Sequence, residues 1–262
     1  MPLRLDAAAV SDTGAHRPVN QDAAFSASWG SAVADGVGGG PSGDLASSVL
    51  VHRLVAAGPM RVSALQLVER LRLANWDLRA HVERNPELRG MATTFTGLFV
   101  GDEGQLLLAH SGDSRAYRLR SGEFVRETRD DSYVQALVER GLIAPEDAAF
   151  HPRRNLITAS LGGGEDDTVT VREVEPVAGD RWVLCSDGLT DYVPEGDVAA
   201  LIAEAATPQD AAAAVVALAL EAGTRDNVTA VVCDVVAGAP LGDFPVFVGA
   251  AASRFCEDFE IA

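Results

Sequence analysis

Four short runs of β-branched or alternating residues follow one another between residues 93 and 127, and they constrain the fold more than any other feature. Turns that contain glycine, such as "DEG" and "SG", separate the runs, which is typical of strands joined in an antiparallel meander. The runs are "TTFTGLFVG" (93–101), "QLLLAHS" (105–111), "SRAYRLR" (114–120) and "EFVRE" (123–127). Because no helix intervenes between them, this region argues against a sheet wound from alternating strands and helices.

Helical periodicity is found in other parts of the chain. The segment 63–85 carries apolar residues at helical spacing, namely Leu65, Val68, Leu71, Leu78 and Val82. This spacing predicts an amphipathic helix. Further helices are expected over 44–57, 132–141, 194–206 and 208–222, and further strands over 180–186 and 227–236. Strands and helices that are segregated in this way favour an α+β fold.

The net charge limits the kinds of partner. The 262 residues include 38 acidic and 21 basic side chains, which gives a formal charge of −17. A protein of this sign is repelled by phosphate backbones, so we expect no nucleic-acid partner. No stretch reaches the roughly 18 apolar residues expected of a membrane span, so we expect no membrane partner either.

The cysteines and the N-terminal residues indicate the cell compartment in which we expect the protein. Cys185, Cys233 and Cys256 are widely spaced and odd in number, which is typical neither of a disulfide framework nor of a zinc site. The first ten residues lack the apolar run of a signal peptide. We therefore expect a cytoplasmic protein, with a monomer as the default state.

Five aspartates share one sequence context, in which an Asp stands at the edge of a strand beside glycine or a small polar residue. They are Asp22, Asp35, Asp113, Asp187 and Asp226. Strand ends converge at one rim of a sheet, where carboxylates distant in sequence can bind a hard cation such as Mn²⁺ or Mg²⁺. Asp-Gly is also a common turn dipeptide, so from this pattern alone a structural role in turns and a metal site both stay open.

Eight motifs occur in an order that resembles one known family. They are "GAHRPVNQD" (14–22), "ADGVGG" (34–39), "MATT" (91–94), "GDSRAY" (112–117), "TRDDS" (128–132), "HPRRNLIT" (151–158), "SDGLTD" (186–191) and "RDNVT" (225–229). Any one of them is weak evidence, but all eight in order resemble the metal-dependent serine/threonine protein phosphatases of the protein phosphatase 2C family, especially its bacterial members. The likeness runs from about residue 6 to 236.

The resemblance implies a four-layer α-β-β-α sandwich. Two antiparallel sheets would pack face to face between helices, with a metal centre at one end. The catalytic domain would span residues 1–236, with a segment called the flap over about 133–165. The tail, residues 237–262, lies beyond the last strand of the family and has no known role. Its Phe and Val content predicts that it docks either on its own domain or on a partner.

The resemblance also assigns roles to the aspartates. Asp35 would bridge two cations, and the carbonyl of Gly36 would bind the second of them. Asp187 and Asp226 would complete the first site, while Asp22 would hold metal-bound water. The glycines at 38–40 would let the backbone turn close to the cations.

Further residues receive roles from the same motifs. Asp113 would form a weaker third cation site with Asp187. Arg17 would bind the substrate phosphate through bidentate hydrogen bonds, and His151, in the flap, would contribute to substrate handling. Gln21 stands where many relatives carry Glu, and Val37 stands where animal relatives carry a His proposed as a general acid.

The function implied is hydrolysis of phosphoserine and phosphothreonine on proteins. Two Mn²⁺ or Mg²⁺ ions sharing one carboxylate would activate a water that attacks phosphorus in line. The natural partners would be a bacterial serine/threonine kinase and its phosphorylated substrates. Two alternatives are a catalytically silent phosphoprotein-binding module of the same fold and a phosphatase of an anti-sigma-factor antagonist.

Overall fold

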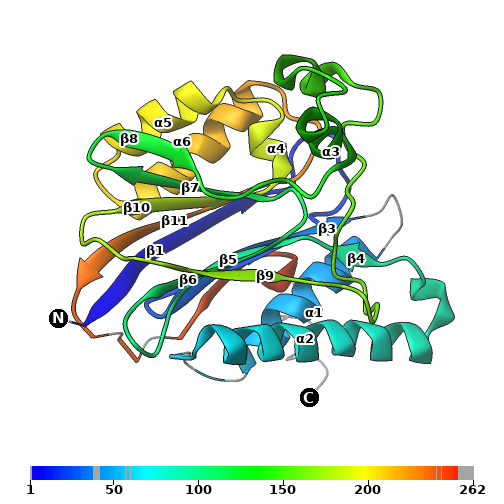
Figure 1. Ribbon diagram of the computed structural model, residues 1–262, viewed down its shortest axis with the longest axis horizontal. Helices are drawn as coiled ribbons and strands as arrows, with labels where there is room; N and C mark the ends of the chain where they lie inside the picture. The colour runs from blue at the N-terminus through cyan, green and yellow to red at the C-terminus, as the bar shows by residue number, and fades with distance from the viewer. Residues whose placement is uncertain are drawn as a thin grey trace.

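The computed structural model describes residues 2–37, 42–56, 58, 61–239, 241–242 and 244–252. In this part of the chain, two antiparallel sheets lie face to face, with helices on both outer faces (Figure 1). One sheet has the strand order β1 (Leu3–Asp12), β11 (Val228–Ala237), β10 (Arg181–Cys185), β7 (Arg115–Arg120) and β8 (Glu123–Arg126). The other has the order β12 (Val246–Gly249), β2 (Asp22–Ala27), β3 (Gly30–Val37), β5 (Phe95–Val100), β6 (Leu106–Ser111) and β9 (Thr170–Val174), with the short β4 (Ala92–Thr93) beside β3.

The helices form the two outer layers. Helices α1 (Gly43–Ala56) and α2 (Ala64–Arg84) cover one sheet, while α4 (Asp187–Thr190), α5 (Glu195–Glu204) and α6 (Pro208–Glu221) cover the other (Figure 1). Helix α3 (Tyr133–Glu139) and the short 3-10 helices Pro86–Leu88 and Pro145–Phe150 complete the elements. The expected α-β-β-α sandwich is therefore confirmed.

Three apolar layers hold the sandwich together. Val33, Leu98 and Trp182 are buried between the two sheets. On the outer faces, the buried Phe99 packs among residues under α1 and α2, and the buried Val183 among residues under α5 and α6. Because β2 and β3 are covered on both faces, they are buried along nearly their whole length instead of alternating.

The buried stripe of helix α2 differs from the predicted one in the first turns of the helix. Leu71 and Leu78 are buried as expected, but Leu67 occupies the inner face, whereas Leu65 is 78% exposed and Val68 is 38% exposed. The helix begins with a capping box between Ser63 and Gln66, which places Leu65 in the first turn on the solvent side. The expected stripe is therefore correct from Leu71 to Val82 and wrong in the first two turns of the helix.

The expected meander over 93–127 is wrong at its centre. Strands β5 and β6 pair in one sheet, whereas β7 and β8 pair in the other. The chain crosses between the sheets at Gly112. Its φ of +108° is allowed for glycine but strained for other residues. A Cβ there would also lie 2.7 Å from the side chain of Thr94. Asp113 therefore stands between the two sheets.

The described part of the tail docks on its own domain, one of the two outcomes expected. Strand β12 pairs with β2 from Val246 opposite Ser26 to Gly249 opposite Ala23. Ala251 is buried in the core under α1. The predicted glycine turn at 38–40 and Cys256 lie outside the described residues. Across the described ranges, none of the helices combines the length and the apolar character needed to traverse a bilayer.

Candidate metal centre

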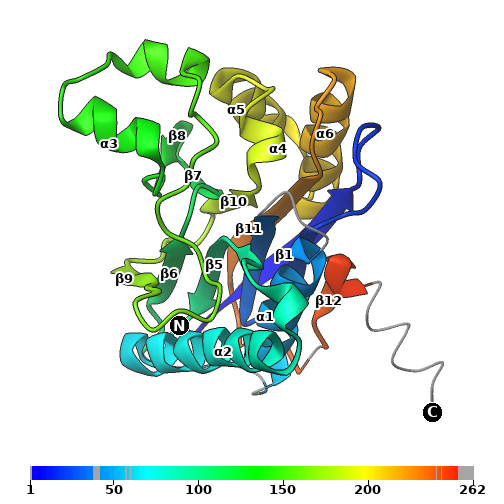
Figure 2. The same ribbon diagram turned by 90° about the vertical axis from the view of Figure 1, so that its right-hand side faces the viewer.

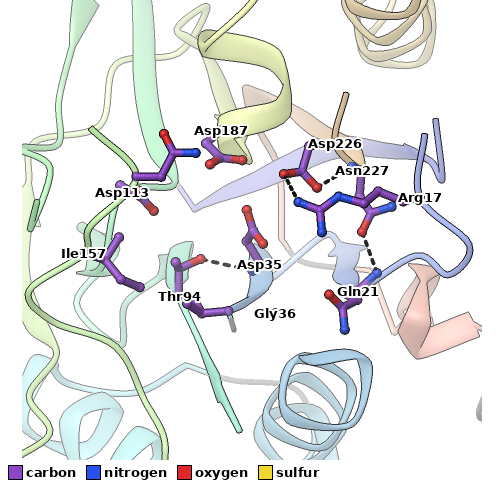
Figure 3. A pocket seen from close by; sticks show the side chains of 12 residues that line it. Arg17, Gln21, Asp35, Gly36, Thr94, Asp113, Ile157, Asp187, Asp226 and Asn227 are labelled. Carbon is purple, nitrogen blue, oxygen red and sulfur yellow. Dashed lines mark hydrogen bonds and ion pairs between the residues drawn. The ribbon is translucent and has the colours of Figure 1, made fainter. Parts of the chain in front are cut away.

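The fold brings the five aspartates to one end of the sandwich, and Figure 3 shows four of them, Asp35, Asp113, Asp187 and Asp226. Asp22 is the first residue of β2, and it lies directly opposite Asp35 in the register with β3. Asp113 stands at the crossing between the sheets, Asp187 opens α4 after β10, and Asp226 comes two residues before β11. The rim predicted from strand ends therefore exists, and it is formed by both sheets.

A pocket of about 200 Å³ opens at this end, and four of the aspartates line it. Asp35, Asp113, Asp187 and Asp226 direct their carboxylates toward it (Figure 3). Asp22 stands opposite Asp35 in the sheet, is only 1% exposed and does not line the pocket. The remaining lining residues include Arg17, Gln21, Gly36, Val37, Thr94 and Asn227.

The electrostatics of the pocket favour a bound cation. Burial, followed by the charges of Asp22, Asp187 and Asp113, raises the pKa of Asp35 well above its ordinary value. Burial, followed by the charge of Asp113, raises the pKa of Asp187 in the same way. Burial and the charge of Asp130 raise the pKa of Asp113 to about 7. Desolvated carboxylates that repel one another are stabilised when a cation neutralises them.

The donor set fits Mn²⁺ or Mg²⁺. Within the described ranges, no group of three or more His, Cys, Asp or Glu side chains is arranged to hold a metal ion by itself. Hard cations of this kind retain several waters and take only one or two carboxylates each, so a closed protein cage is not required. Among the described residues that line the pocket, every negatively charged group is a carboxylate, whose oxygens are the ligands these cations prefer.

Two threonines of the "MATT" motif fix the backbone of Asp35, and sequence reasoning missed them. The N–H of Asp35 donates to Oγ1 of Thr94 at 3.0 Å, and the carbonyl of Asp35 accepts from the N–H of Thr94 at 2.8 Å. Oγ1 of Thr93 donates to the same carbonyl at 2.9 Å. Thr94 also shares a 2.6 Å hydrogen bond with Ser114, next to Asp113. These bonds aim Asp35 into the pocket.

Gly36 is required by close packing as well as by its place in the motif. A Cβ at this position would lie 2.3 Å from the carbonyl oxygen of Gly43, at the start of α1, and 2.7 Å from that of Gln21. The N–H of Gly36 donates to the carbonyl of Gln21 at 3.1 Å, and that carbonyl also accepts from Oγ of Ser47. A larger residue would separate α1 from the strand that carries Asp35.

Arg17 points toward the pocket from the loop before β2 (Figure 3). Its Nη2 donates to Oδ2 of Asp226 at 2.6 Å, and the two side chains are 42% and 33% exposed. Asn227 organises this loop, because its Nδ2 donates to the carbonyls of Thr13 at 2.8 Å and Val19 at 3.1 Å. The "RDN" motif therefore supplies the ion-pair partner of Arg17, which is Asp226, and the residue that holds its loop, which is Asn227. The role of Asn227 was not predicted from the sequence.

His151, unlike the other predicted site residues that face the pocket, is held in contacts within its own segment. Its ring packs 5.8 Å from that of Tyr133, and its Nδ1 accepts from the N–H of Arg153 at 3.1 Å. From the same segment, the described lining of the pocket includes Asn155 and Ile157 instead. The expected role of His151 in substrate handling therefore finds no support in this geometry.

The chain is similar to characterised phosphatases over most of its length. The profile of the protein phosphatase 2C family matches residues 15–222. The serine/threonine protein phosphatase PstP of Mycobacterium tuberculosis is 43% identical over 241 residues, which are 89% of this chain and 46% of that protein. The serine/threonine phosphatase stp of Listeria innocua is 33% identical over 205 residues, which are 75% of this chain and 81% of that protein. The chain thus spans less than half the length of the mycobacterial relative.

Solved structures agree with the observed fold. The crystal structure of the Mycobacterium tuberculosis phosphatase PstP superposes with a TM-score of 0.83 at 39% identity, covering 89% of this chain and 100% of that one. The catalytic domain of PstP in complex with two manganese ions superposes with a TM-score of 0.80 at 39% identity, covering 90% of this chain and 100% of that one. Together with the eight motifs and the convergent aspartates, these matches place the chain in the protein phosphatase 2C family.

Proposed function

We propose that this chain hydrolyses phosphoserine and phosphothreonine on proteins with the help of bound Mn²⁺ or Mg²⁺. The observation that carries the proposal is the convergence of four carboxylates and Arg17 on one pocket of about 200 Å³. A phosphate ester needs cations and a guanidinium around its oxygens, and this pocket has the residues for both. The relatives named as serine/threonine phosphatases support the same activity.

The cation ligands we propose are oxygens of the pocket. Asp35 would bridge two cations, Asp187 and Asp226 would complete the first site, and the carbonyl of Gly36 would contribute to the second. Asp113 with Asp187 would form a weaker third site. Two bound cations would supply a water nucleophile at neutral pH and neutralise charge on the phosphoryl group. The two manganese ions of the PstP catalytic domain support this number.

Arg17 is proposed to bind the phosphate. In this structure it pairs with Asp226, which is itself one of the proposed cation ligands. An Asp226 carboxylate that binds a cation holds a guanidinium less strongly, so Arg17 becomes available to a phosphate oxygen. The exposed position of the pair permits this change at little cost.

Asp22, which pairs with Asp35 in the sheet, is proposed to hold the water shell of the cations. Its Oδ2 accepts from Oγ of Ser186 at 2.7 Å, which fixes the carboxylate on the side of Asp187. The division into a catalytic domain (1–236) with its flap (133–165) and a tail (237–262), the kinase partner, the monomeric state and the cytoplasmic location stay predictions from the sequence.

The proposal is tested with purified protein and a phosphothreonine peptide. Hydrolysis is measured with Mn²⁺, with Mg²⁺ and with excess chelator, and p-nitrophenyl phosphate serves as a second substrate. We expect turnover of both substrates that requires added cation. A protein that is folded and binds Mn²⁺ but turns over neither substrate would refute the proposed activity.

A further inference from the structure

We propose that the tail segment 244–252 is a positioning element of the metal centre, acting through the backbone of Asp22. This inference rests on the proposed function, because it concerns the same site. The superposed structures of the relative PstP cover about nine tenths of this chain and all of their own. The family match spans residues 15–222 and ends before the tail.

The tail covers an otherwise open edge of the sheet that carries two of the aspartates. Strand β12 pairs with β2, which pairs in turn with β3, and Figure 2 shows β12 beside α1 at this edge. The ring of Phe247 lies 4.4 Å from that of His52, and 6.5 Å from that of Phe25. After the strand, the carbonyl of Ala251 contacts Nε2 of His52 at 2.9 Å. The segment is thus anchored on both β2 and α1.

Gly249 is the point at which the tail meets the site. Its φ is +66°, and a Cβ built on it would lie 2.2 Å from the carbonyl oxygen of Asp22 and 3.0 Å from Oγ of Ser11. No side chain fits there unless Asp22 moves. Only glycine combines this left-handed backbone with so close an approach.

The contacts of Asp22 connect Gly249 to the proposed metal centre. Its N–H donates to Oδ1 of Asn20 at 3.1 Å, and Nδ2 of Asn20 donates to Oγ of Ser11 at 2.8 Å. Asp22 also stands opposite Asp35 in the sheet register. A Cβ on Gly249 would therefore press on the carbonyl of Asp22 and on the Ser11 hydroxyl, which accepts from the Asn20 side chain that receives the N–H of Asp22. A displacement at Gly249 reaches the proposed bridging carboxylate through two strand pairings, that of β12 with β2 and that of β2 with β3.

The decisive experiment measures the Mn²⁺ Kd of the full chain by calorimetry, beside the Mn²⁺ dependence of turnover. Gly249→Ala is expected to raise the Kd by about 10-fold or more, the size of effect seen for residues that orient metal ligands. Turnover of this variant is expected to recover at saturating Mn²⁺, which a partly unfolded protein would not do. Gly90→Ala is the matched control, because Gly90 has a φ of +88° and nothing within 4 Å of its Cβ position.

A second pair of variants decides the question if Gly249→Ala does not fold. Phe247→Ala removes the ring contacts that hold β12 and is expected to raise the Mn²⁺ Kd. Val246→Ala, at a position that is 60% exposed in the same strand, is expected to leave it unchanged. A folded Gly249→Ala or Phe247→Ala protein with the wild-type Kd would overturn the inference. A wild-type protein that binds no Mn²⁺ would instead refute the proposed function.

Discussion

Replacing Asp22 with Asn should make the metal-free protein more stable at neutral pH, although the residue lies in the proposed centre. Burial raises the pKa of Asp22 from 3.8 to about 6, against the hydrogen bonds from Thr229 and Ser186, which lower it. A folded-state pKa above the unfolded one means that the folded protein binds the extra proton between these values. Stability from this group is therefore fully present below about pH 4 and is lost as the pH rises through about 6.

The size of the effect follows from the same values. A rise in pKa from 3.8 to about 6 corresponds to about 3 kcal/mol of unfolding free energy that wild-type protein loses between acidic and mildly alkaline pH. Asp22→Asn does not titrate and keeps an amide oxygen that can accept from Ser186. The difference in stability between variant and wild type should therefore grow by about 3 kcal/mol in favour of the variant over this range.

The assay is urea unfolding followed by circular dichroism, in excess chelator, at a series of pH values from about 4 to about 8. Asp102→Asn, on an exposed turn, is the control for the loss of one negative charge. With Mn²⁺ present, wild-type protein should have the larger unfolding free energy, because a cation stabilises the ionised wild-type site more than the site of the Asp22→Asn variant. An Asp22→Asn protein whose unfolding free energy follows the same pH profile as wild type would refute the reasoning.

Three further substitutions test other parts of the site. Asp35→Asn should lower kcat/KM for a phosphothreonine peptide by on the order of 1000-fold at saturating Mn²⁺, because it removes the proposed bridging ligand; near-normal turnover would contradict that role. Arg17→Lys should raise KM for the peptide by about 10-fold through loss of bidentate binding. Its unfolding free energy should change by less than about 1 kcal/mol, because the pair with Asp226 is exposed; an unchanged KM would argue against phosphate binding. Gly36→Ala should cost about 1–3 kcal/mol in thermal unfolding, because its Cβ meets the carbonyl of Gly43; wild-type stability would contradict the packing.

Local patterns in the sequence predicted an α+β fold and the convergence of the aspartates, whereas the sandwich and the roles of single residues came from the resemblance to the family. Asp35 and Asp187 stand in Asp-Gly steps after apolar strands, and strand ends meet at a rim whatever the order of strands. The crossing at Gly112 was missed because periodicity marks each strand without saying which sheet it joins. The inner face of α2 was misread for a related reason, since Leu65 and Leu67 are equally apolar.

The supporting hydrogen bonds could not be predicted. Thr94 and Asn227 are small polar residues of common types. Their role depends on the hydrogen bonds that Thr94 makes with Asp35 and Asn227 makes with the loop of Arg17. No spacing in the sequence encodes such hydrogen bonds. Gly249 belongs to the same class, because its close approach to Asp22 depends on a pairing between residues far apart in the chain.

The most direct test of the central claim is anomalous diffraction at the manganese absorption edge from crystals grown with Mn²⁺. The account predicts two strong peaks about 3.5–4 Å apart, both within ligand distance of the Asp35 carboxylate. A weaker third peak is expected between Asp113 and Asp187. Crystals soaked in Mn²⁺ that show no peak at Asp35, or a single peak bound by other residues, would contradict the account.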